Sequence, residues 1–182
     1  MTAIVQIDAV ETLRKRRLVG FCSILDSRNV EMYYDLLWYK FLERISHNDL
    51  VAHRNLYGVC ARLNNNSGFF EYWTAVETYE GDQLADDLVP IDLSAGLYGS
   101  RVEKPEKNLA KVYSQLISGW KTPSDYILNW NQPFFEVFQP NWFNREAVKI
   151  SVPLYVSSAT SNWLVSLPSE SPSMGQPVGT DR

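Results

Sequence analysis

One order of secondary structure, strand-helix-strand-strand, occurs twice along this chain, and few folds accommodate such a duplication. The first occurrence starts with a strand pattern at residues 17–25. Apolar residues then recur every three or four positions over residues 30–45, which predicts an amphipathic helix. Two segments rich in aromatic and β-branched residues follow at 56–63 and 69–79, and both are predicted strands.

The second occurrence starts with a predicted strand at residues 91–102. Pro105 suits the first turn of a helix, and an apolar stripe at helical spacing continues from there to Trp120. Two more strands are predicted at 134–138 and 147–156. We therefore predict an α+β fold in which duplicated strand-helix-strand-strand units form an antiparallel sheet with the helices on one side.

The segments before and after the two units mark the limits of a single domain in this chain of 182 residues. Residues 1–12 have a weak pattern and are predicted to be an N-terminal lead-in that frays over 1–11. The domain is expected at 13–156, with pseudo-repeats at about 13–80 and 90–156. Residues 157–182 are rich in Ser, Pro and Gly and are predicted to be a flexible tail, because they bury too little to offset ordering entropy.

The charge balance argues against a dedicated nucleic-acid binder. Lys and Arg total 17 against 21 Asp and Glu, which gives a net charge of −4, whereas such binders carry a basic footprint. The basic run at residues 14–17 is interpreted as a solvated strand start. No apolar run is long enough to span a membrane, and the N-terminus lacks a signal-peptide pattern, so we expect a cytoplasmic protein without membrane contact.

The supply of metal ligands is small. Cys22 and Cys60 are too few for a disulfide scaffold or a thiolate zinc site, and His47 and His53 add little. No sequence motif for a phosphate loop, a dinucleotide site or a nucleophile elbow is present. We therefore expect no metal and no cofactor.

Glu136 is the residue that carries the functional argument. It lies in the middle of an otherwise apolar strand, and alternation places it on one face with Phe134 and Phe138. Phe135 and Val137 take the other face. Because the Phe135 and Val137 face suits packing against a helix, we expect Glu136 to point away from the helices.

A carboxylate among aromatic rings has two chemical uses. It can attract a cation that the rings also hold, or, when desolvated, it can serve as a general acid or base. The pattern alone favours a solvent-facing glutamate, because that is the more common case.

A family resemblance favours the pocket. The chain resembles the GyrI-like small-molecule-binding domains, which include effector-binding domains of AraC-type and MerR-type multidrug-sensing transcription activators. The matching stretches of the second half are residues 91–98, the helix reaching Trp120, residues 135–138 and residues 148–154. In the first half, residues 36–38 and the aromatic pair Tyr72-Trp73 are also similar to the family.

The resemblance implies a central groove between the two units that binds hydrophobic, often cationic, small molecules. The family's pocket glutamate falls on Glu136, and Phe138 matches a lining position. Many members have a tyrosine where this chain has Ser151, which implies a wider or more polar pocket. Further lining residues are expected among the ring-bearing side chains Phe134, Trp38, Trp73 and Tyr113.

The leading hypothesis is a stand-alone binding domain that senses or sequesters hydrophobic cations. No helix-turn-helix fits in residues 1–12, so direct DNA binding is not expected, and any role in transcription would require a protein partner. Exposed sheet edges would also permit a homodimer.

Two alternatives stay open. In a hydrolase of electrophilic small molecules, Glu136 would activate water and Tyr113 would donate a proton, although we favour a non-enzymatic protein. In a gyrase-inhibitor-like interaction module, the acidic connector at residues 82–87 would imitate DNA, although a solvated loop is the favoured interpretation.

Overall fold

The structure, a computed structural model, contains eleven strands and one helix among the residues that it describes. The described residues are 5–26, 28, 30–46, 53–61, 68–82, 85–103, 120–121, 125–139 and 147–157. The elements are β1 (Val5–Gln6), β2 (Ala9–Leu13), β3 (Arg16–Asp26), α1 (Val30–Ile45), β4 (Leu56–Ala61), β5 (Phe69–Glu77), β6 (Val89–Leu93), β7 (Gly96–Glu103), β8 (Trp120–Lys121), β9 (Tyr126–Leu128), β10 (Phe134–Phe138) and β11 (Val148–Val156).

The main sheet is antiparallel, and its strand order shows the duplication. The order is β2-β7-β11-β10-β4-β5-β3-β6, and β9 pairs with β11. Along the chain, β3, β4 and β5 of the first unit correspond to β7, β10 and β11 of the second, and in both units the last strand lies between the other two. The two units meet where β10 pairs with β4. The predicted α+β class with duplicated units is confirmed.

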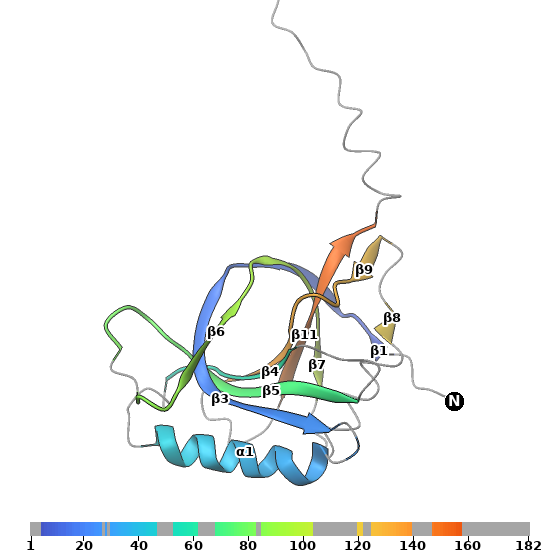
Figure 1. Cartoon of the computed structure of the whole chain (residues 1–182). Coiled ribbons are helices and arrows are strands. Elements are labelled where there is room, and N and C mark those ends of the chain that lie inside the picture. Colours follow the sequence, from blue (N-terminus) through green and yellow to red (C-terminus); the bar gives the residue numbers. More distant parts are fainter. Residues whose placement is uncertain are drawn as a thin grey trace, which may run out of the picture.

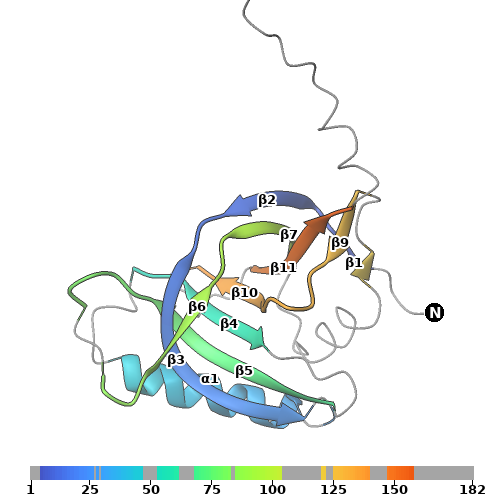
Figure 2. The ribbon, with the colours of Figure 1, turned by 45° about the horizontal axis from the view of Figure 1, so that its top comes forward.

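The sheet curls strongly because its two ends are joined by the chain itself. Residues 14–15 connect β2 to β3, and residues 94–95 connect β6 to β7. Since β2 pairs with β7 and β3 pairs with β6, these runs form one bent ribbon that brings the ends of the sheet together. Figures 1 and 2 show the resulting ring of strands, with α1 on its outer side.

One predicted strand is therefore two strands. The sequence pattern predicts a continuous strand at residues 91–102, but β6 ends at Leu93 and β7 begins at Gly96. The pairing changes at this break, because β6 borders β3 whereas β7 borders β11. The periodicity of a segment does not show that the strand paired with it changes halfway along the segment.

The helix α1 covers the outer face of the sheet beside β3 and β5 (Figure 1). Its inward stripe is buried, with Tyr34, Trp38, Phe41 and Ile45 all at or below 7% exposure. Tyr33, by contrast, is turned outward. The predicted amphipathic helix at residues 30–45 is confirmed.

Two hydrophobic clusters lie on the two faces of the sheet. The outer cluster joins α1 to side chains that include Phe70, Tyr72, Phe134, Phe138 and Ile150. The inner cluster, enclosed by the curl, consists of Leu18, Tyr57, Val59, Trp73, Ala75, Leu93, Tyr98 and Phe135. Because both faces of these strands are buried, many of the strands are continuous apolar runs in the sequence and do not alternate between polar and apolar residues.

The expected N-terminal fraying is wrong for part of the segment. Ala9–Leu13 forms β2 and pairs with β7, so residues at the start of the chain complete the curl. None of its five residues is buried and their exposure does not alternate, which explains the weak sequence pattern.

Some predictions lie outside the described residues. These are most of the second predicted helix, with Tyr113, and residues 158–182 of the predicted tail. Among the helices that the structure does describe, none has the length and apolar character needed to cross a membrane.

Candidate functional site

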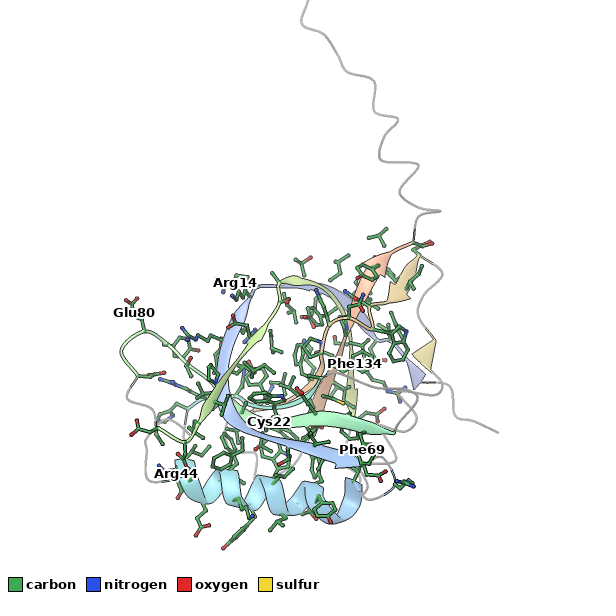
Figure 3. All side chains as sticks on the ribbon, viewed as in Figure 1. Arg14, Cys22, Arg44, Phe69, Glu80 and Phe134 are labelled. Atoms are coloured by element: carbon green, nitrogen blue, oxygen red, sulfur yellow. The ribbon has the colours of Figure 1, made fainter. Side chains whose placement is uncertain are left out.

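Glu136 is completely buried between the sheet and α1. It is the central residue of β10, is 0% exposed, and shares its face with Phe134 and Phe138. Phe134, marked in Figure 3, is 1% exposed. A tyrosine hydroxyl from α1 reaches the carboxylate, so the described helix packs on the Glu136 face.

The predicted orientation of β10 was therefore wrong. We expected Phe135 and Val137 to face the helices, but Phe135 belongs to the inner cluster and Glu136 faces α1. Alternation shows which residues share a face, but both faces of this strand are buried, so it does not show which face meets a helix.

Two phenol groups hold the carboxylate. The hydroxyl of Tyr34 on α1 donates to Glu136 Oε1 over 2.9 Å, and the hydroxyl of Tyr72 on β5 donates to the same oxygen. Trp38 Nε1 in turn donates to the Tyr72 oxygen over 3.1 Å. Hydrogen bonds to a charged acceptor are strong, so this relay stabilises the ionised form of Glu136.

The titration of neighbouring groups is consistent with this arrangement. Burial and then the Glu136 charge raise the pKa of the Tyr34 phenol well above its usual value, so Tyr34 stays a donor at neutral pH. The same two causes raise the pKa of the Cys60 thiol on β4.

Gly58 makes room for the carboxylate. It pairs directly with Glu136 across β4 and β10, at the junction of the two units. A Cβ at this position would collide with Glu136 Oε1 and with the Tyr72 hydroxyl. The lack of a side chain therefore allows the glutamate to lie over its neighbour strand and meet both phenols.

Aromatic rings surround the site. The Trp38 and Phe138 rings are 4.9 Å apart between centroids, in an edge-to-face arrangement. The Tyr34 ring lies 5.3 Å from the Tyr72 ring and 6.3 Å from the Trp38 ring. The result is one carboxylate in an aromatic layer, a chemistry that suits a bulky cation.

A family model matches the sequence from β2 to β11. Its description is integron-associated effector binding protein (Cass2), and it matches residues 9–156. The chain belongs to this family. It is thus a small-molecule effector-binding domain, and the predicted GyrI-like relationship is confirmed.

Solved structures share the fold of this effector-binding domain at low sequence identity. SAV2435 bound to tetraphenylphosphonium is 18% identical, with a TM-score of 0.58 over 81% of this chain and 93% of that chain. An integron cassette protein from Vibrio cholerae is 15% identical, with a TM-score of 0.55 over 81% and 95%. The EcmrR C-terminal domain is 12% identical, with a TM-score of 0.54 over 82% and 97%. A comparison with curated protein sequences found no match.

The effector-binding domain brings only some of the predicted lining residues together. Trp38, Phe134 and Phe138 lie in the outer cluster that surrounds Glu136. Trp73 lies in the inner cluster, and Ser151 pairs with Phe135, so both are on the opposite side of the sheet from the carboxylate. Tyr113 is outside the described residues.

The inner face has polar atoms of its own. Within the part of the chain that the structure describes, Trp73 Nε1 and Ser151 Oγ are buried without a hydrogen-bond partner. Arg16 donates to the Tyr57 hydroxyl over 2.7 Å and to Glu77 over 3.0 Å at another position on this face. Whether ligand contacts Trp73 or Ser151 stays a prediction.

Tyr34, Tyr72 and Gly58 are the site residues that the sequence analysis did not assign. Tyr34 is part of the apolar stripe of a helix, and Tyr72 lies within an aromatic strand. Each pattern therefore predicts a side chain packed in the hydrophobic core and gives no sign of a functional role. A signal existed for Gly58, because glycine inside a strand often marks a close approach of another group.

Two carboxylates after β5 are paired with arginines. In the acidic connector, Asp82 receives a 2.8 Å hydrogen bond from Arg54 Nη2, and Asp87 receives a 2.9 Å bond from Arg44. Figure 3 shows Arg44 at the end of α1 and Glu80 in the loop after β5. A connector that imitates DNA would need a net negative charge without partners. These two pairs neutralise part of that charge.

Two surface hollows lined by described residues lie away from Glu136. One, of about 350 Å³, is lined by Phe21, Lys40, Glu43 and Arg44. Another, of about 510 Å³, is lined by Lys15, Arg17, Pro90, Ile91 and Asp92. Over the described ranges, no three His, Cys, Asp or Glu side chains gather as a metal site would require.

Proposed function

We propose that this effector-binding domain binds hydrophobic cations and that Glu136 is the counter-ion for the ligand. The observation that carries the proposal is a carboxylate that is 0% exposed, held by Tyr34 and Tyr72. Burying such a group is costly, so a site that retains it is a candidate for function.

The energetics favour a cationic ligand. Two phenol donors offset part of the desolvation cost, but a positive charge close by would contribute more, because Coulomb attraction is stronger away from water. The rings of Trp38 and Phe138 offer apolar area and cation–π contact to the same molecule. A large aromatic cation is therefore better suited than a small hydrated ion.

The structural neighbour SAV2435, which was solved with tetraphenylphosphonium, supports this choice of ligand class. Tetraphenylphosphonium combines one delocalised positive charge with four rings. It is accordingly the probe of choice for the site around Glu136, with Phe134, Phe138 and Trp38 as proposed lining residues and Trp73, Ser151 and Tyr113 as further proposed contacts.

Ligand contact with Glu136 requires movement. At 0% exposure, no solvent reaches the carboxylate. Tyr34 of α1 donates to it directly, and Trp38 of α1 is linked to it through the Tyr72 hydroxyl. We expect these side chains to shift on binding, so association should be slower than for a preformed open site.

The test is titration with tetraphenylphosphonium, followed by tryptophan fluorescence. Glu136→Gln should weaken binding at least about tenfold, since it removes the charge and keeps the shape. Glu103→Gln is the matched control, because Glu103 pairs with Arg101 on β7. Equal binding by the native protein and Glu136→Gln, with circular dichroism showing both folded, would refute the proposal.

The proposed physiological role is sequestration or sensing of such compounds, with any effect on transcription exerted through a partner. A binder returns its ligand unchanged, whereas a hydrolase would convert it. Chromatography of an electrophilic substrate incubated with the native protein and with Glu136→Gln separates these cases. Conversion that depends on Glu136 would replace the binding role with an enzymatic one.

A further inference from the structure

We infer that Thr74 is a second polar contact for the ligand and that it selects cations bearing N–H groups over fully substituted ones. This inference rests on the proposed function of Glu136. Thr74 lies on β5, is 0% exposed, and has an Oγ1 atom without a hydrogen-bond partner among the described residues.

The register places Thr74 beside the carboxylate. Glu136 pairs with Gly58, and Gly58 pairs with Thr74, so the three residues form one row across β10, β4 and β5 on the same face. The carboxylate already lies over Gly58, where a Cβ would collide with it. The Tyr72 hydroxyl lies over the same glycine, so the carboxylate, this phenol and Thr74 are neighbours on one face of the sheet.

An unpartnered hydroxyl in this position has a cost that packing does not explain. The surrounding layer is aromatic and apolar, and valine would fill the same volume without leaving a buried polar atom unsatisfied. Its neighbours on the row are Gly58 and Phe21, and neither side chain offers a hydrogen bond. A ligand donor is the partner that the site lacks.

The pair of acceptors defines a ligand subclass. A primary ammonium has several N–H donors. Once Tyr34 and Trp38 have shifted, as the proposed function requires, one nitrogen above the row can donate to Glu136 and to Thr74 Oγ1 at once. A trimethylammonium or a phosphonium has no N–H and gains only charge attraction and ring contact. Thr74 therefore adds affinity for the first kind alone.

The experiment compares two ligands with the same rings and charge. Calorimetry measures binding of biphenylmethylammonium and of its N,N,N-trimethyl derivative to the native protein, Thr74→Val and Thr74→Ser. Thr74→Val should weaken the ammonium ligand at least about tenfold and leave the trimethyl ligand within about twofold. Thr74→Ser keeps the hydroxyl and should retain the preference.

Urea unfolding of the free variants provides a second readout. Because Thr74→Val removes an unsatisfied polar atom, its unfolding midpoint should equal or exceed that of the native protein. A lower midpoint shows a structural hydroxyl and overturns the inference, as does equal weakening of both ligands by Thr74→Val. If neither ligand binds the native protein, the proposed function fails with it, whereas binding of both without a Thr74 effect refutes this inference alone.

Discussion

Glu136 lies directly opposite Gly58 in the antiparallel pair of β10 and β4, and its carboxylate fills the space that a side chain at position 58 would take. This contact is at the junction of the two structural units. It ties the glycine of one unit to the buried charge of the other, so the site depends on both halves of the fold.

Gly58→Ala should destabilise the protein by about 1–3 kcal/mol, because the new methyl group collides with Glu136 Oε1 and the Tyr72 hydroxyl. Urea unfolding measures the change. The double variant Gly58→Ala with Glu136→Ala should recover part of the loss, since one of the colliding groups is gone. Strictly additive effects would contradict the contact.

The two phenols should differ in importance. Tyr34→Phe removes one donor from the carboxylate and should cost about 1–3 kcal/mol of stability. Tyr72→Phe removes a donor and also the acceptor of Trp38 Nε1, so its loss should be larger. Unfolding curves that rank the two variants the other way would show that the relay through Trp38 contributes nothing.

The two cysteines should react very differently. Cys22 is exposed, whereas Cys60 is buried, and burial together with the Glu136 charge raises the pKa of its thiol. In Cys22→Ser at about pH 8, iodoacetamide should label Cys60 far more slowly in the folded protein than in urea. Equal rates in the two conditions would mean that the layer over Glu136 is open.

Stability should fall in acid partly through the connector. The Arg54 hydrogen bond, and then the Tyr79 backbone, lower the pKa of Asp82 to about 2 from 3.8. Because the folded-state pKa is depressed, this pair stabilises the protein above about pH 4 and loses its effect as the pH falls toward 2.

The corresponding measurement is the melting temperature of the native protein and of Asp82→Asn between pH 2 and pH 7. The difference between them should be constant above about pH 4 and shrink toward zero near pH 2. High salt should reduce it, since the pair is close to solvent. If the difference in melting temperature did not depend on pH, the contribution of Asp82 would come from the packing of its side chain and not from its charge.

Local pattern was sufficient for most of the elements. The helix at Val30–Ile45 and the strands β4, β5, β10 and β11 follow directly from the periodicity and residue types within each segment. The break between β6 and β7 and the early strand β2 did not, since they depend on pairing between segments far apart in sequence.

The sequence predicted only the part of the site that lies on one strand, β10. Alternation placed Glu136 with Phe134 and Phe138, as the structure shows. The tyrosines that hold it come from α1 and β5, and no single-segment pattern predicts that they meet β10. The side of the sheet was misjudged for the same reason, because the compensation for a buried charge lies on other elements.

Calorimetric comparison of tetraphenylphosphonium with the isosteric anion tetraphenylborate tests the central claim most directly. The two ions have the same rings and size and differ in the sign of their charge. The account predicts that the native protein binds the cation and rejects the anion, and that Glu136→Gln loses most of this discrimination. Equal affinity of the native protein for both ions, or discrimination unchanged in Glu136→Gln, would contradict it.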